Sequence, residues 1–351
     1  MTSYIYLRKL LSNLLVFCLI YFIYVYPFYV LNYLITNEQI FKLSSLLLTF
    51  LFFILISFYF KSHNTFFLFR FFIYEGMGFG FISFWITNFG LIISILYSIT
   101  SPKFGISCFL IILILTFISL INGKKIKLKK INITTIKFKK TIKFIFLSDI
   151  HLGTNSSKHL EKIISKIKNL DYDFILIGGD LIDSSSFKLD GLLKFLNIKK
   201  PILFISGNHE YYIKNSKDKL KELKNYNLLF LDNKSFKIDK INIVGVSDNQ
   251  NNLNQIKIVN KFIDENLFNL VVVHKPTIWN SIYKKTDLML SGHTHNGQIF
   301  PFNLLVKFKF KYLYGLYEKL NSKLYVSSGS SCWGPHMRLG SNNEIIYFFI
   351  N

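Results

Sequence analysis

The chain has 351 residues, half of them apolar, and a formal net charge of +22 at pH 7. This length allows two or three domains with ample cores. Only three of its 42 basic residues are Arg, which disfavours a reader of nucleic-acid bases. Its three Cys residues, two of them in apolar runs, disfavour a disulfide framework or a thiolate metal site.

Four long segments before residue 124 contain no Asp, Glu, Lys or Arg: residues 10–36, 43–60, 76–102 and 104–123. Each is long enough, or nearly so, to cross a hydrocarbon layer about 30 Å thick. Pro27 is tolerable in such a helix. The first segment is too long for the apolar part of a signal peptide and lacks a small-residue cleavage site. We therefore predict an all-α transmembrane domain of four helices over residues 1–123.

The basic residues between these segments predict an orientation. The segments before the first run, between the second and third runs, and after the fourth run carry Arg8, Lys9, Lys61, Arg70 and nine lysines between residues 124 and 143. The connections after the first and third runs carry only Lys42 and Lys103. By the positive-inside tendency, both termini and the remainder of the chain face the cytoplasm of a multi-pass protein of the cell (inner or plasma) membrane. We predict that residues 124–141 form a Lys-rich juxtamembrane linker attracted to anionic headgroups.

Residues 142–351 alternate between apolar runs and helical patterns. The runs that predict buried strands are 143–147, 174–177, 202–205, 270–273 and 288–290, and each is followed by a polar motif. Residues 157–170 have apolar side chains at helical spacing. Segments 228–247 and 323–350 also have the composition of strands. Because open α/β sheets bind ligands at the carboxyl ends of their strands, the motifs are expected to meet at one edge.

The motifs combine histidine with carboxylate and amide side chains. They are Asp149-Ile150-His151, Gly179-Asp180, Gly207-Asn208-His209-Glu210, His274 and Gly292-His293-Thr294-His295, and they hold five of the eight histidines. On an extended segment, side chains two residues apart project to the same side. We therefore expect Asp149 and His151 to grip one ion, and His293 and His295 share this spacing.

The remaining motifs predict a second ion. Asp180, placed by a glycine that permits a tight turn, could bridge two cations with its two oxygens. Asn208 offers a neutral carbonyl, and His274 with one histidine of the last motif would complete the second site. Mixed His, Asp and Asn ligation suits Mn, Fe or Zn. Two such divalent metal ions would lower the pKa of a bridging water and bind both the attacking and the leaving oxygen of a displacement at phosphorus. The motifs therefore predict phosphoester hydrolysis by a metal-bridging hydroxide.

Other polar residues near the motifs have predicted roles. His209 is expected to protonate the leaving group or to stabilise developing charge, and Asp183 to hold the His209 ring by a hydrogen bond. Arg338, the only Arg after residue 123, is a candidate for contacting the substrate phosphate, and the alternative is a cation on a surface loop. Glu210 is expected to be structural. Three histidines outside the motifs are expected to have no role in the site: His63, His159 and His336.

The ordered motifs resemble the calcineurin-like metallophosphoesterase superfamily over roughly residues 142–351. The tail, with Asn296-Gly297-Gln298 and residues 325–329 and 334–340, is most similar to the bacterial membrane-associated, YkuE-type branch. The resemblance implies an α/β (α+β) four-layer sandwich of two mixed β-sheets flanked by helices. It also implies one metal site of Asp149, His151, Asp180 and His295, and another of Asp180, Asn208, His274 and His293.

The leading hypothesis is a membrane-anchored, metal-dependent phosphoesterase acting on a phosphomonoester or phosphodiester, for which lipid-linked esters and nucleotides are candidates. Its expected partners are the lipid bilayer and this substrate, with no specific nucleic acid. A catalytically weak sensor of phosphate ligands, coupled to the membrane domain, is the alternative. A transporter is disfavoured because the predicted spans carry no charged residue, although Arg70 and Glu75 lie at a boundary. A nuclease is disfavoured because no platform of aromatic and Arg residues is evident.

Overall fold

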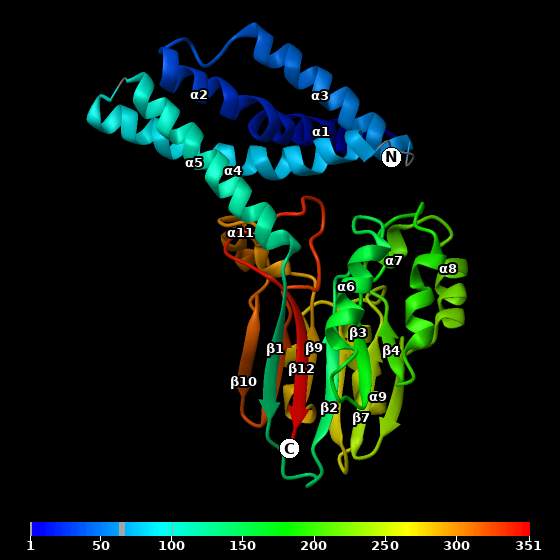
Figure 1. The fold of residues 1–351 in the computed structure, drawn as a ribbon. Coiled ribbons are helices and arrows are strands. Elements are labelled where there is room, and N and C mark those ends of the chain that lie inside the picture. Colours follow the sequence, from blue (N-terminus) through cyan, green and yellow to red (C-terminus); the bar gives the residue numbers. More distant parts are fainter. Residues whose placement is uncertain (1, 63–66, 100) are drawn as a thin grey trace. The chain divides into compact units, whose positions relative to one another are not determined.

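The computed structural model describes residues 2–62, 67–99 and 101–351 (Figure 1), so His63 lies outside the described residues. The chain divides into two compact units. One unit, here called the helical unit, comprises residues 1–121 and 334–337. The other, here called the sandwich unit, comprises residues 122–333 and 338–351.

Long apolar helices build the helical unit. They are α1 (Thr2–Ile20), the π-helical turn η1 (Tyr21–Val25), α2 (Tyr26–Thr36), α3 (Leu43–Ser62), α4 (Phe67–Tyr97) and α5 (Pro102–Lys124). The π-helical turn ends at Val25, two residues before Pro27. Pro27 sits in the first turn of α2, where a missing backbone N–H is tolerated. Four stretches are long and apolar enough to cross a membrane: residues 6–36, 43–61, 69–97 and 102–124. The prediction of four N-terminal apolar helices that could span a membrane is confirmed.

The third span begins earlier than the uncharged run had predicted. Helix α4 starts at Phe67 and therefore includes Arg70 and Glu75. Glu75 is buried, and its carboxylate pairs with the Nδ1 atom of His336 at 2.7 Å within the helical unit. Glu75 thus lies inside a candidate span, where the ring and the one backbone N–H of His336 both contact its carboxylate.

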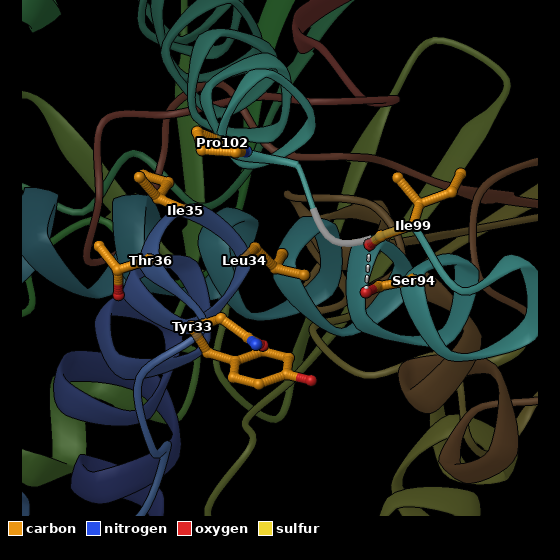
Figure 2. Close-up of a pocket in the computed structure, with 8 residues that line it drawn as sticks. Tyr33, Leu34, Ile35, Thr36, Ser94, Ile99 and Pro102 are labelled. Atoms are coloured by element: carbon orange, nitrogen blue, oxygen red, sulfur yellow. Dashed lines mark hydrogen bonds between the residues drawn. The ribbon is translucent and has the colours of Figure 1, made fainter.

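A pocket in the helical unit is shown in Figure 2. Its lining residues are Tyr33, Leu34, Ile35, Thr36, Asn37, Ser94, Ile99 and Pro102. The Ser94 hydroxyl donates a hydrogen bond of 2.7 Å to the carbonyl of Ile99. These described lining residues include no histidine, cysteine or carboxylate, so this pocket does not supply the ligand types that the sequence motifs predict.

Two six-stranded mixed sheets form the sandwich unit. The first has the order β1 (Ile126–Ile133), β12 (Asn343–Ile350), β2 (Ile142–Leu147), β3 (Phe174–Gly178), β4 (Ile202–Ile205), β5 (Leu228–Phe230). The second has the order β10 (Gly315–Lys319), β11 (Ser322–Val326), β9 (Leu288–Ser291), β8 (Phe268–Val273), β7 (Ile241–Val246), β6 (Lys234–Ile238). Strands β2 to β5 are parallel, and β7, β8, β9 and β11 are parallel in the other sheet.

Helices and helical turns connect these strands. They are α6 (Ser157–Ile167), η2 (Leu189–Asn197), α7 (His209–Tyr212), α8 (Ser216–Glu222), η3 (Leu223–Tyr226), α9 (Asn252–Phe262), α10 (Trp279–Ile282), η4 (Tyr283–Lys285), η5 (His295–Gly297) and α11 (Phe302–Lys309). Three buried cores separate four layers: one contains Leu160 of α6, one lies between the sheets, and one contains Val259 of α9. The predicted four-layer sandwich of two mixed sheets flanked by helices is confirmed.

The predicted linker over residues 124–141 needs correction. Residues 126–133 form strand β1, which pairs in parallel with β12 at the edge of the first sheet. Ile126, Ile131 and Ile133 are buried, whereas most lysines between them remain exposed. Lysine is typical of edge strands because its charge opposes pairing with other chains. The Lys content that suggested a linker is therefore that of an edge strand.

The core between the sheets predicts a large loss of stability when one ring is removed. Phe144 is fully buried and stacks on Phe174 and Phe348, with both ring centroids 4.9 Å away. We expect Phe144→Ala to lower the free energy of unfolding by about 3–5 kcal/mol through lost contacts and a cavity. Pulse proteolysis of the detergent-solubilised chain in urea measures this change. Ile136→Ala, at a fully exposed side chain, is the control and should change it little; equal effects would contradict the assigned core.

Candidate metal centre

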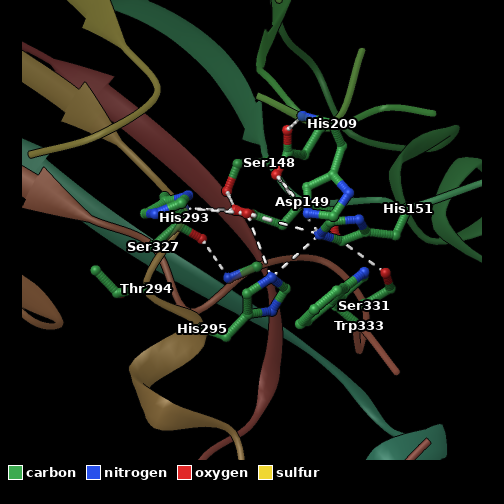
Figure 3. A network of polar contacts seen from close by, with 12 residues as sticks. Ser148, Asp149, His151, His209, His293, Thr294, His295, Ser327, Ser331 and Trp333 are labelled. Atoms are coloured by element: carbon green, nitrogen blue, oxygen red, sulfur yellow. Dashed lines mark hydrogen bonds and ion pairs between the residues drawn. The ribbon is translucent and has the colours of Figure 1, made fainter. Parts of the chain in front are cut away.

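The predicted ligands follow the carboxyl ends of strands in both sheets. Asp149 and His151 follow β2, Asp180 follows β3, Asn208 follows β4, His274 follows β8, and His293 and His295 follow β9. Parallel strands end at a common edge, so the two sheets deliver these side chains to one place. Figure 3 shows Asp149, His151, His293 and His295 converging there.

The turns that carry the ligands have unusual backbone conformations. Five of the seven predicted ligands have left-handed φ angles: Asp149 (52°), His151 (50°), Asp180 (54°), His293 (70°) and His295 (49°). Such conformations are disfavoured for residues with a Cβ atom and cluster at functional sites. The expectation that alternation along an extended segment aligns Asp149 with His151 is therefore wrong. Left-handed conformations at both Asp149 and His151, with Ile150 between them, direct the two side chains instead.

Three side chains form the first cluster of ligand atoms. The Nε2 atoms of His151 and His295 lie 3.1 Å apart, and Asp149 Oδ1 lies 3.4 Å from His295 Nε2 and 3.9 Å from His151 Nε2. The Asp149 carboxylate is oriented by the Ser148 hydroxyl at 2.6 Å and the His293 backbone N–H at 3.0 Å. These atoms are close enough to hold one metal ion together.

The second cluster contains Asp180, His274 and His293. Asp180 Oδ2 lies 3.0 Å from His274 Nε2, which lies 3.3 Å from His293 Nδ1. The His274 Nδ1–H donates to the Gly178 carbonyl at 2.9 Å, which leaves Nε2 directed at the cluster. Asp180 Oδ2 is also 3.8 Å from His151 Nε2 of the first cluster. The Asp180 carboxylate therefore lies between the two clusters, as a bridging ligand requires.

Asn208, the remaining predicted ligand, has a buried side-chain oxygen. Asn208 Oδ1 is buried and accepts no hydrogen bond from the described residues. A buried polar atom without a partner is costly and calls for an explanation. Asn208 directly precedes His209, whose backbone N–H donates to Asp180 Oδ1 at 2.9 Å. This free acceptor, together with the two clusters, fits divalent cations of the borderline type.

Burial and charge set the protonation of the histidines. Burial lowers the pKa of His293 to about 2 and that of His209 to about 4, so both rings are neutral at pH 7. Burial alone would also lower the pKa of His274, but the adjacent Asp180 carboxylate outweighs it and raises that pKa to about 10. A proton on His274 thus balances the buried Asp180 charge. A metal cation at this position would do the same.

Asp183 holds a different histidine from the one predicted. Its Oδ2 lies 3.3 Å from His151 Nδ1, and its Oδ1 accepts the Thr154 backbone N–H at 2.7 Å. Burial would raise the pKa of Asp183, but the contact with His151 outweighs burial and lowers it. The predicted hydrogen bond from Asp183 to the His209 ring is therefore replaced by a contact with His151. This contact directs Nε2 of that ring toward the first cluster.

His209 lies at the rim of the two clusters. Its side chain is 16% exposed, and its Nε2 is 3.9 Å from Asp180 Oδ2. Its ring packs edge-on against His151, with centroids 4.7 Å apart, and against the half-exposed Trp333 at 5.2 Å. Sequence reasoning missed Trp333, because a single Trp in a loop gives no signal of the ring it will contact.

Arg338 does not face a substrate. Its guanidinium is fully buried and donates to Asn343 Oδ1 (2.8 Å), the His295 carbonyl (2.7 Å), Ser341 Oγ (3.3 Å) and the carbonyls of Ser328 and Ser331 (both 2.7 Å). These contacts use all five N–H donors of an arginine. The predicted substrate contact is therefore wrong, as is the alternative of a surface cation. Arg338 instead fixes the loop that carries His295.

Glu210 is structural, as expected. Its buried carboxylate accepts the backbone N–H groups of Asp180, Ile182 and Gly207 at 3.0, 2.8 and 2.7 Å. It therefore ties the Asp180 turn to the Asn208 turn. His159 lies outside the clusters and donates to the Ser330 carbonyl at 3.0 Å.

Comparison with known proteins identifies the family. The family model described as calcineurin-like phosphoesterase matches residues 142–297. An uncharacterized metallophosphoesterase of Campylobacter jejuni is 34% identical over 260 residues, which cover 69% of this chain and 68% of that protein. One from Helicobacter pylori is 37% identical over 233 residues, so the chain spans 63% of that relative's length. A transmembrane protein with metallophosphoesterase domain from Danio rerio is 30% identical, covering 58% of this chain and 52% of that protein.

These matches span the strands and turns that deliver the clustered ligands. The family match begins at β2 and extends through His295. We conclude that this chain belongs to the calcineurin-like phosphoesterase family.

Proposed function

We propose that the chain is a membrane-anchored phosphoesterase that uses two divalent ions. The observation that carries this proposal is the Asp180 carboxylate, whose Oδ2 faces His274 at 3.0 Å and His151 at 3.8 Å. Asp149 and His295 would complete the ligands of the ion next to His151. Asn208 and His293 would do so for the ion next to His274.

The two ions, once bound, would supply an acidified water as nucleophile and positive charge for the phosphoryl oxygens. The chain's own residues set the geometry around them. The left-handed turns and the Glu210 carboxylate fix the ligands before binding, which reduces the reorganisation that binding requires. His209 at the rim, with its ring neutral at pH 7, would stabilise the developing charge by donating a hydrogen bond to the leaving oxygen.

Four apolar helices and a transmembrane relative support membrane localisation. We propose further that the sandwich unit faces the cytoplasm at the inner or plasma membrane. The distribution of basic residues supports this orientation, because the lysines concentrate between residues 124 and 143. A phosphomonoester or a phosphodiester would suit the centre.

Removing the bridging carboxylate is the most direct activity test. We expect the full chain with added Mn²⁺ to hydrolyse bis(p-nitrophenyl) phosphate, and Asp180→Asn to abolish this because a neutral amide cannot balance two cations. Asp190→Asn, at an exposed position of η2, makes the same change of charge and should retain activity. Unchanged turnover in Asp180→Asn would refute the assignment, and metal binding without turnover would favour the sensor.

The number of ions can be tested separately from activity. We expect elemental analysis to find two divalent ions per chain. His293→Ala should reduce this to about one, because it removes a ligand from the second cluster only. His159→Ala, at a histidine outside the clusters, should leave the content unchanged. A single ion per wild-type chain would contradict the dinuclear proposal.

Asp183 is predicted to act through His151. Asp183→Asn should weaken metal binding by about 10–100-fold, because an uncharged partner orients the His151 ring less strongly. Titration with metal should then restore activity at higher concentration. Asp171→Asn, at an exposed carboxylate, is the matched control. An unaltered affinity would show that Asp183 does not position this ligand.

A further inference from the structure

Helix α11 presents apolar side chains to the surface of the sandwich unit. None of its residues is buried, and Leu304, Leu305 and Phe308 are 51%, 54% and 89% exposed. Positions i, i+1 and i+4 lie on one side of a helix, so these three form a single apolar face. By contrast, helices α6 and α9 each bury apolar residues against a sheet.

Lysines flank this apolar face. At 100° per residue, Lys307 and Lys309 fall on its two sides, and Lys311 follows the helix. All three are exposed, and the sequence contains no Asp or Glu between residues 288 and 317. An exposed apolar face bordered by lysines is typical of helices that lie in the interface of an anionic bilayer. The lysine heads can reach phosphate groups while the apolar side chains enter the acyl boundary.

Both ends of α11 are tied to candidate metal ligands. The helix follows η5, which begins at His295, and Gly297 packs so closely that an added Cβ would lie 2.2 Å from Asn303 Cα. At the other end, the ring of Phe310 packs edge-on against His293, with centroids 5.2 Å apart. The helix therefore lies beside the metal centre, on the same edge of the sandwich.

The chain also enters the sandwich unit at this edge. Strand β1 begins at Ile126, which pairs with Asn343 at the beginning of β12. Because β12 runs antiparallel to β2, the first residues of β1 and of β12 lie at the carboxyl end of β2. Asn343 Nδ2 donates to the Gly123 carbonyl at 2.7 Å, and Asn343 Oδ1 accepts from Arg338, which in turn donates to the His295 carbonyl. Three hydrogen bonds thus join residue 123, next to the end of a candidate span, to a candidate metal ligand.

We propose that α11 docks on the anionic headgroup region of the bilayer and holds the metal centre at the level of lipid phosphoesters. The substrate class is then a phosphoester of a lipid headgroup, and this part rests on the proposed phosphoesterase function. The docking itself does not depend on turnover. Three features favour a lipid surface over a second protein: the charge of the flanking lysines, the exposed apolar face, and the position of both at the edge where the chain enters from the last candidate span.

Fluorescence of the full chain in lipid nanodiscs tests the docking. The exposed Cys18 is first replaced by Ala, and an environment-sensitive NBD label is then attached to Phe308→Cys. The control carries the same label at Leu253→Cys, because Leu253 is an exposed leucine on α9 with asparagines as neighbours. In discs with phosphatidylglycerol, lipid-borne nitroxide should quench the label at 308 at least about twofold more than the label at 253. Equal quenching would overturn the proposal. If the label at 308 instead reports an apolar environment in detergent, and this effect rises with protein concentration, the face binds a second copy of the chain. That result would also overturn the proposal.

Two substrates then test the substrate class. We expect Phe308→Ser to lower hydrolysis of phosphatidyl-p-nitrophenol in these discs by about tenfold, while hydrolysis of soluble bis(p-nitrophenyl) phosphate changes less than about twofold. Equal losses on both substrates would contradict a docking role. If the wild-type chain cleaves neither, the proposed phosphoesterase function fails, whereas the quenching result still decides the docking.

Discussion

The whole site depends on the balance of charge around the buried Asp180 carboxylate. Burial disfavours this charge, yet two imidazole rings lie within reach of it: the His274 ring, and the His151 ring of the first cluster. The Glu210 carboxylate is an acceptor already occupied by backbone N–H groups, so it cannot neutralise Asp180. The Asn208 carbonyl is also an acceptor, and no donor to it lies among the described residues. The buried acceptors of this site are of the types that could hold cations.

Several features of the fold hold the residues around Asp180 in position. Parallel strands of two sheets end at one edge, and left-handed turns direct the ligands inward from there. Arg338 fixes the His295 loop, and Asn343 connects Arg338 to residue 123. The same hydrogen bonds that orient a ligand therefore anchor the start of the sandwich unit. These contacts would link the proposed docking at a membrane to the placement of the metal ligands.

The fold class and the set of clustered ligands could be predicted, because apolar runs and residue types encode them locally. Six of the seven predicted ligands lie in the two clusters, and Asn208 precedes His209, whose backbone N–H donates to Asp180. The left-handed turns at Asp149 and His151 could not be predicted, since non-glycine residues give no sequence signal for them. The partners of Asp183 and Arg338 depend on tertiary packing, which spacing along the chain does not reveal. Strand β1 was missed because a Lys-rich edge strand has the composition of a linker.

The central claim is that two neighbouring cations share the Asp180 carboxylate. Electron paramagnetic resonance of the Mn²⁺-loaded full chain tests it most directly, because ions about 3.5–4 Å apart couple magnetically through a shared ligand. The account predicts the signal of a spin-coupled pair that Asp180→Asn eliminates. A spectrum of isolated Mn²⁺ at full loading, the same in wild type and variant, would contradict it.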